Sequence, residues 1–205
     1  MTAKPIADAP TIDDSLGYAL LAHARAAIHH ALTGESLSVP EDPRLDTPGA
    51  TFVTLTQNHQ LRGCIGSLEA YRPLREDVRA NALAAAFEDP RFPPLSRHEW
   101  PSITLEVSLL SPPEPLTFTD ETALIAQLRP HQDGLILAAG PYRATFLPQV
   151  WKQLPDPEAF LAALKQKAGL DPFRPVPGLK AWRYSVTAWH EPAQPNGASP
   201  KGAPQ

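Results

Sequence analysis

The residues best suited to chemistry gather around the one cysteine of the chain. Residues 61–66 read Leu-Arg-Gly-Cys-Ile-Gly, which places Cys64 between Gly63 and Gly66. Arg62 is the cation nearest to the cysteine in the sequence. A thiol can act as a nucleophile, and glycines permit a positive φ or the close approach of another backbone or a ligand. Free cysteine is also a common packing residue, so a small buried side chain on a crowded strand is the alternative.

Glu106 is the candidate acid or base. It lies on the polar side of residues 102–110, where apolar and polar residues alternate. If helices cover both faces of the sheet, its carboxylate is buried, its pKa is raised, and it can exchange protons with a substrate. The alternative is a glutamate that simply faces water.

Arginines offer a place for an anion. Arg62 and Arg91 are candidate ligands for a carboxylate or phosphate, and Arg72, Arg75 and Arg79 fall on one face of a predicted helix. A solvated helix face with local acidic partners is the alternative. We therefore expect the substrate-binding residues to be Arg62, Gly63, Gly66 and Arg91, with a small anionic ligand.

Composition excludes several other classes of protein. The seven histidines show no metal-binding spacing, so we predict no metal site and assign no cofactor. One cysteine can form neither an intrachain disulfide nor an iron–sulfur cluster held by this chain alone. A formal net charge of −4 disfavours nucleic acid as a partner. No apolar stretch is long enough for a membrane span or a signal sequence, so we expect a cytoplasmic protein.

Periodicity and turn residues predict the elements that position these side chains. Helices are expected over residues 13–32, 73–88, 120–128 and 156–167, and strands over 51–57, 61–66, 102–110, 135–139, 142–147 and 181–189. Strands in adjacent pairs, mixed with helices at irregular intervals, favour an α+β fold with a largely antiparallel sheet. We expect a flexible N-terminus over 1–12, one folded domain over 13–190, and a disordered tail rich in Pro, Gly and Ala over 191–205.

Several strings, read in order, resemble the AMMECR domain family. They are Leu-Arg-Gly-Cys-Ile-Gly at 61–66, Asp-Pro-Arg-Phe-Pro-Pro-Leu at 89–95 and Glu-Val-Ser-Leu-Leu-Ser-Pro-Pro at 106–113, with shorter matches at 133–137, 146–150 and 167–170. The likeness runs from about residue 16 to 189. It implies a main antiparallel sheet with flanking helices and a smaller lobe, with the cysteine motif near a groove. It also implies a Memo-like protein and a radical SAM protein as partners, in the AmmeMemoRadiSam system, and carries no established activity.

One departure from the family bears on mechanism. Some members have a second cysteine where this chain has Lys165, so a two-cysteine mechanism is disfavoured. We therefore expect an accessory or substrate-binding component whose radical chemistry belongs to a partner. The first alternative is a stand-alone enzyme with Cys64 as nucleophile and Glu106, or a histidine placed by the fold, as general base. The second is a protein-interaction or RNA-binding module, which the acidic balance disfavours.

Overall fold

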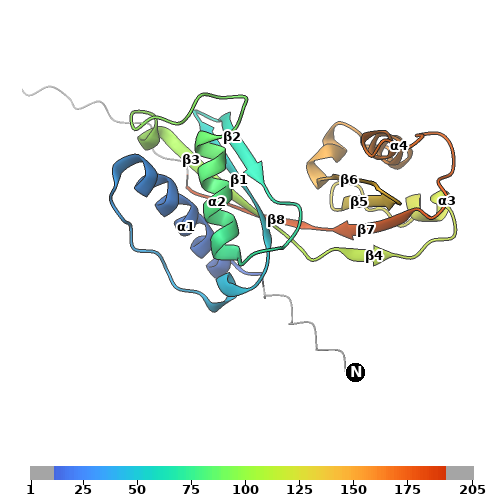
Figure 1. Cartoon of the computed structure of the whole chain (residues 1–205), viewed down its shortest axis with the longest axis horizontal. Coiled ribbons are helices and arrows are strands. Elements are labelled where there is room, and N and C mark those ends of the chain that lie inside the picture. The colour runs from blue at the N-terminus through green and yellow to red at the C-terminus, as the bar shows by residue number, and fades with distance from the viewer. Residues whose placement is uncertain (1–11, 193–205) are drawn as a thin grey trace, which may run out of the picture. The chain divides into compact units, whose positions relative to one another are not determined.

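The chain builds two four-stranded sheets within residues 12–192, the part that the computed structural model describes (Figure 1). The first unit runs to Leu109 and resumes at Thr187, and the second unit is the intervening segment Leu110–Val186. Each unit has its own hydrophobic core. Both sheets are antiparallel and mixed with helices, so the predicted α+β class is confirmed.

The first unit places two helices on one face of its sheet (Figure 1). The strands have the order β2-β1-β3-β8. Their bounds and those of the helices are α1 (Asp14–Thr33), β1 (Ala50–Gln57), β2 (Gln60–Gly66), α2 (Leu74–Phe87), β3 (Ile103–Leu110) and β8 (Val186–His190), with short 3₁₀ helices at Pro43–Asp46 and Trp100–Ser102. The side chains of these strands that face the helices form the first core.

The second unit has the strand order β4-β7-β5-β6. Its elements are β4 (Glu114–Leu116), α3 (Glu121–Ile125), β5 (Gly134–Ala139), β6 (Tyr142–Phe146), a 3₁₀ helix (Pro148–Lys152), α4 (Pro157–Lys167) and β7 (Lys180–Tyr184). Trp151 stacks on Phe160 of α4 in its core, with ring centroids 3.7 Å apart. The indole N–H of Trp151 donates to the carbonyl of Asp133, so this buried ring leaves no polar atom unsatisfied.

The helix α1 forms because its sequence combines an apolar stripe with clear end signals. Leu16, Leu20 and Ile28 recur at helical spacing and are fully buried, and burial of each contributes about 1.5–3 kcal/mol. Asp13 caps the first turn, and Gly34 ends the helix at φ 82°, which glycine adopts without steric cost. The structure extends the predicted helix by one residue at its C-terminal end.

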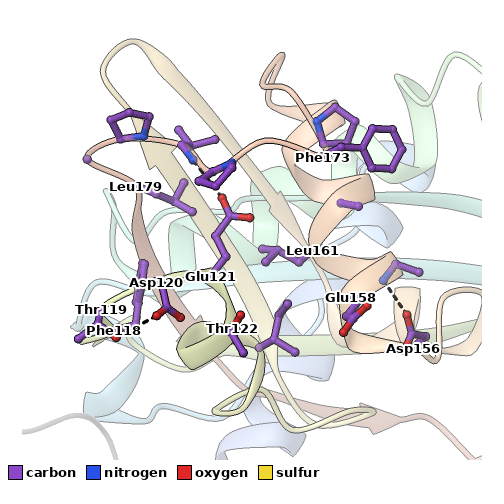
Figure 2. A pocket seen from close by; sticks show the side chains of 18 residues that line it. Phe118, Thr119, Asp120, Glu121, Thr122, Asp156, Glu158, Leu161, Phe173 and Leu179 are labelled. Atoms are coloured by element: carbon purple, nitrogen blue, oxygen red, sulfur yellow. Dashed lines mark hydrogen bonds between the residues drawn. The ribbon is translucent and has the colours of Figure 1, made fainter.

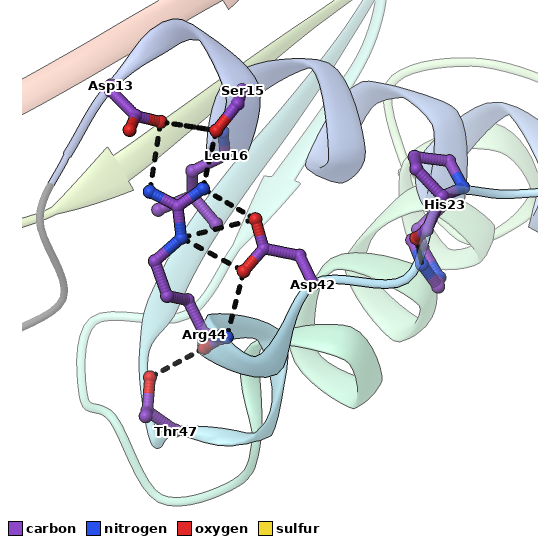
Figure 3. Close-up of polar contacts among 8 residues, drawn as sticks. Asp13, Ser15, Leu16, His23, Asp42, Arg44 and Thr47 are labelled. Atoms are coloured by element: carbon purple, nitrogen blue, oxygen red, sulfur yellow. Dashed lines mark hydrogen bonds and ion pairs between the residues drawn. The ribbon is translucent and has the colours of Figure 1, made fainter.

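A polar cluster fastens the start of α1 to the loop before β1 (Figure 3). Arg44 donates to Asp13 at 2.9 Å, to Asp42 at 2.5 Å and to the hydroxyl of Ser15 at 2.6 Å. Hydrogen bonds from Ser15, from the Leu16 backbone and from Arg44 lower the pKa of Asp13 to about 2. The capping carboxylate therefore stays ionised in mildly acidic solution and can complement the positive end of the helix dipole.

A tight hairpin joins β1 to the strand that carries the cysteine. Asn58 and His59 form its two-residue loop with φ values of 51° and 64°, the left-handed region that such hairpin turns require. The pairing that follows places Thr54 directly opposite Cys64. Both predicted strands are confirmed to within one residue.

The last predicted strand is wrong in one respect. Residues 181–189 were expected as one strand, but the structure breaks at Ser185 into β7 of the second sheet and β8 of the first. Ser185 exchanges hydrogen bonds with Ser111, which holds the break in place. The helix predicted over 120–128 ends earlier, at Ile125, and the short strand β4 was not predicted.

The predicted N-terminal and C-terminal extensions lie almost wholly outside the described residues. Glu191, expected as the first residue of the tail, is described and is bound. Its backbone N–H donates to the carbonyl of Leu105, and its carboxylate pairs with Arg25. None of the helices within residues 12–192 combines the length and the apolar character that a membrane crossing needs.

Candidate functional site

Cys64 lies on the face of β2 that points away from the helices. Its neighbour Ile65 packs on the first core, and side chains alternate along a strand, so the thiol projects to the opposite side. The side chain is half-buried. The hydroxyl of Thr54 on β1 donates to Sγ at 3.3 Å, so the thiol is held in the cross-strand pair that the register creates.

The backbone of Cys64 is clamped by the loop after α2. Its N–H donates to the carboxylate of Asp89 at 2.9 Å, and its carbonyl accepts from the Arg91 guanidinium at 3.3 Å. Arg91 also forms a bidentate pair with Asp89, at 2.9 and 2.7 Å. These contacts, with Arg91 the largest cause, hold the pKa of the buried Asp89 carboxyl well below its usual range. The string 89–91 therefore fixes the position of the cysteine.

Arg62 is directed away from the cysteine by an irregularity in the sheet. The pairing of β1 with β2 skips Arg62, which makes it the extra residue of a β-bulge. Its buried guanidinium donates to Glu99 at 2.8 Å and to the carbonyl of Pro93 at 2.9 Å, and lies over the ring of Phe92. Arg62, followed by hydrogen bonds from Ser96, lowers the pKa of Glu99 to about 2. Most of the hydrogen-bonding capacity of Arg62 is therefore used within the protein.

The two glycines of the motif allow neighbouring groups of the protein to approach the strand β2 closely, and they do not adopt an unusual backbone angle. Neither belongs to the glycines with positive φ. A Cβ on Gly63 would lie 2.1 Å from the carbonyl oxygen of Ala85 in α2, and a Cβ on Gly66 would lie 2.2 Å from the ring of Phe52. The space beside each glycine is thus filled by the protein itself, and a role for either in binding substrate stays a prediction.

Glu106 has a partner that the sequence did not reveal. It projects from β3 on the face without helices, because its neighbours Leu105 and Val107 both belong to the first core. The condition for its burial, helices on both faces of the sheet, is not met among the described elements of the first unit, and the Glu106 side chain is 29% exposed. Nδ1 of His190 on the adjacent strand β8 lies 3.0 Å from its carboxylate. The fold therefore supplies a carboxylate–imidazole pair.

The proposed nucleophile and the proposed base share a face but are not in contact. β1 lies between β2 and β3, so the backbones of Cys64 and Glu106 are at least two strand spacings apart, about 9–10 Å. Within residues 12–192 no hydrogen bond joins the two side chains. Proton transfer between them would need a bridging water or substrate group, and their catalytic roles stay predictions.

The predicted arginine face is divided among internal partners. Arg72 donates at 2.9 Å to Asp77, whose carboxylate is fully buried, and Arg75 donates at 2.7 Å to Asp46. Arg79 is exposed. Two of the three guanidinium groups are therefore committed to fastening α2, which leaves little of a continuous surface for phosphate groups.

Among the described residues, no three or more His, Cys, Asp or Glu side chains are grouped so that they could hold a metal ion.

The structure brings Cys64, Thr54, Asp89 and Arg91 together, and separates Arg62 and Glu106 from them. Asp89 and His190 were missing from the predicted site. Asp89 stands out in the sequence only as part of the string at 89–95, and no local pattern indicates its contact with Cys64, 25 positions earlier.

Comparison with known proteins agrees with the strings noted in the sequence. The model of the AMMECR1 family matches residues 21–189. The chain belongs to the AMMECR1 family. The match spans elements of both units and contains every predicted site residue, so the resemblance seen in the sequence is confirmed.

Archaeal relatives and a solved structure support the AMMECR1 assignment. A protein of Sulfolobus acidocaldarius is 40% identical over 173 residues, covering 79% of this chain and 76% of that protein. A protein of Methanocaldococcus jannaschii is 36% identical over 184 residues, covering 85% and 89%. The crystal structure of an uncharacterized protein from Pyrococcus horikoshii matches with a TM-score of 0.72 at 33% identity, covering 89% of this chain and 95% of that one.

Proposed function

We propose that this chain is an accessory, substrate-binding component that acts in the cytoplasm with a Memo-like protein and a radical SAM protein. The observation that carries the accessory role is at Cys64. Within the described residues its thiol is hydrogen-bonded to the Thr54 hydroxyl and to no imidazole or carboxylate. A nucleophilic cysteine ordinarily has a neighbouring base or another activating group. We therefore assign substrate binding to this motif, and the chemical step on the substrate to a partner protein.

The choice of partners rests on membership of the AMMECR1 family and on the cysteine count. The family resemblance implies a Memo-like protein and a radical SAM protein as companions. A radical SAM enzyme needs an iron–sulfur cluster, and this chain has one cysteine, so the cluster would belong to the companion.

Arg91 is the group best placed to receive an anionic part of the substrate. Its side chain is 52% exposed, and although Nε and Nη2 are bound to Asp89, Nη1 has no hydrogen-bond partner within residues 12–192. The clamp on Asp89 and Cys64 fixes the guanidinium in one orientation, which lowers the entropy cost of binding a carboxylate or phosphate.

Affinity capture of the full-length protein from its own cells tests the partners. We expect a Memo-like protein and a radical SAM protein to be enriched relative to an untagged control, and the isolated chain to show no turnover. Enrichment of neither partner, together with turnover of a metabolite by the isolated chain, would reject the accessory role.

A titration with inorganic phosphate tests the anion site separately. We expect the backbone NMR signals of Cys64 and Arg91 to shift in the full-length protein, and the shift to be lost in Arg91→Ala. Lys152→Ala removes an exposed cation of the second unit and is the control expected to keep the response. Equal responses in both variants would reject a site at Arg91.

The pair formed by Glu106 and His190 favours a second candidate, a stand-alone enzyme with Cys64 as nucleophile. A substrate lying across the open face of the sheet would connect the thiol to this pair. In that case Cys64→Ser and Glu106→Gln should each abolish turnover with little change in melting temperature. A large loss of melting temperature without loss of turnover would instead assign Cys64 to packing.

The ion pairs of Arg72 and Arg75 weaken the third candidate, a protein-interaction or RNA-binding module.

A further inference from the structure

The second unit contains a pocket that is independent of the cysteine motif. Its volume is about 960 Å³, within the range of small-molecule sites, and all of its walls come from residues 118–179. The walls are the segment that starts α3, the first turns of α4, and the proline-rich loop 172–179. Figure 2 shows Phe173 and Leu179 on opposite sides of the view, with Glu121 and Leu161 between them.

The loop that forms one wall is fixed in place by the ion pair of Lys165 with Glu121. Lys165 of α4 is fully buried and donates to both carboxylate oxygens of Glu121, at 3.0 and 2.9 Å, and to the carbonyl of Arg174 at 2.8 Å. Glu121 also accepts from the backbone N–H of Val176 at 3.1 Å. The pocket is therefore preformed, which reduces the entropy cost of binding a ligand.

The wall carries an excess of negative charge. Four carboxylates line the pocket, and Lys165 neutralises one of them, Glu121. Asp120 and Asp156 cap α3 and α4 and lie at the surface, and Glu158 has no hydrogen bond or ion pair within the described residues. No lysine or arginine is among the residues that line the pocket. Three of the four lining carboxylates therefore lack a basic side-chain partner, and Figure 2 shows two of them, Asp156 and Glu158, together on one side of the pocket.

Apart from Thr119 and Thr122, the other side chains of the lining are apolar. Ile125, Leu161 and Leu179 contribute aliphatic surface, and Phe173 lines the pocket while 90% of its surface is exposed to solvent. An exposed aromatic ring beside carboxylates can hold a cation over its face and an apolar group against its edge. The lining thus matches a molecule that carries both.

We propose that this pocket binds a small organic cation, consisting of one protonated amine joined to an apolar body. The amine lies beside the carboxylates of Asp156 and Glu158, which Figure 2 shows together on the side of the pocket that carries Phe173, and the apolar body lies against Leu161 and Phe173. This inference goes beyond the accessory function proposed above and stands on different residues, so either can fail without the other.

The test uses 4-phenylbutylamine and its neutral analogue 4-phenylbutanol in calorimetric titrations of the full-length protein. We expect the amine to bind roughly three- to tenfold more tightly than the alcohol, and the difference to shrink in high salt. Glu158→Lys should remove the preference for the amine. Glu76→Lys, which reverses an exposed carboxylate in the first turn of α2, is the matched control and should retain it.

A second variant and a peptide separate the remaining outcomes. Phe173→Ala removes an exposed ring and should leave the melting temperature unchanged while weakening the binding of both compounds. Amine binding that survives both Glu158→Lys and Phe173→Ala would place the amine elsewhere and overturn the proposal. Absence of amine binding would also overturn it, as would binding confined to a short lysine-containing peptide, which would make the pocket a protein-docking site.

Discussion

The carboxylate of Asp89 accepts a hydrogen bond from the backbone N–H of Cys64, 2.9 Å away, across 25 residues of sequence. The same carboxylate is held by Arg91, whose guanidinium returns to the carbonyl of Cys64. Two strings of the family signature therefore form one structural piece, in which the loop after α2 takes up hydrogen-bonding groups of the strand β2. Substitutions in the loop should consequently change the position and accessibility of the Cys64 thiol.

Removal of Asp89 should destabilise the protein and loosen the motif. Asp89→Ala leaves the N–H of Cys64 without its acceptor, and we expect a loss of about 1–3 kcal/mol in the free energy of unfolding. Urea denaturation measures this loss, and the alkylation rate of Cys64 should rise in the same variant. Glu88→Ala removes the exposed neighbouring carboxylate and should change neither quantity.

The pair between Arg62 and Glu99 should make stability depend on pH. The pKa of Glu99 is about 2 in the folded protein against an ordinary value of 4.5, so the folded state binds its proton more weakly than the unfolded chain. The stabilisation is fully present above about pH 4.5 and is lost as the pH falls towards about 2. The difference in unfolding free energy between wild type and Glu99→Gln should therefore shrink over this range in urea titrations. A constant difference would contradict the assignment.

A methyl group on Gly63 should cost more than one on Gly66. Gly63→Ala forces Cβ against the backbone carbonyl of Ala85, which can move only with α2, so we expect a loss of about 1–3 kcal/mol. Gly66→Ala meets the half-buried ring of Phe52, which can rotate away. Thermal unfolding should rank the two variants in this order, and Phe52→Ala should restore part of the stability lost in Gly66→Ala.

Replacement of Lys165 should lower the free energy of unfolding, because it leaves the Glu121 carboxylate unpaired. Lys165→Met leaves Glu121 at a partly buried site without its cation, and we expect a loss of about 2–3 kcal/mol. The double variant Lys165→Met with Glu121→Gln removes the charge but keeps an acceptor for the N–H of Val176, and should be more stable than Lys165→Met alone. Equal stabilities would mean that solvent already screens the pair.

The pattern of apolar and turn residues was enough to predict most helices and strands. It failed where the end of a strand depends on pairing with residues distant in the sequence. Alternation continues without a break from Trp182 through Ser185 to Ala188, so the pattern at Ser185 does not show that the chain leaves one sheet and enters the other. The hairpin at Asn58 and His59 was predictable because its signal lies in adjacent residues.

The site was predicted less completely for the same reason. The motif around Cys64 is visible in one string, but its contact with Asp89 and the pairing of Glu106 with His190 depend on tertiary structure. The β-bulge that redirects Arg62 also has no local signal, because a bulge is defined by the register of two strands. Residue type thus indicated which groups are chemically capable, and the fold determined which of them meet.

The strand β8 completes the first sheet, yet it follows the whole second unit in the sequence. During synthesis, residues 110–186 leave the ribosome before β8 exists, so the second unit can fold while the first still lacks an edge strand. Until then β3 has an open edge, which is available for incorrect pairing. The order of synthesis therefore makes the first unit the last to finish, and a slow or truncated C-terminal end should trap the chain with its cysteine-bearing sheet incomplete.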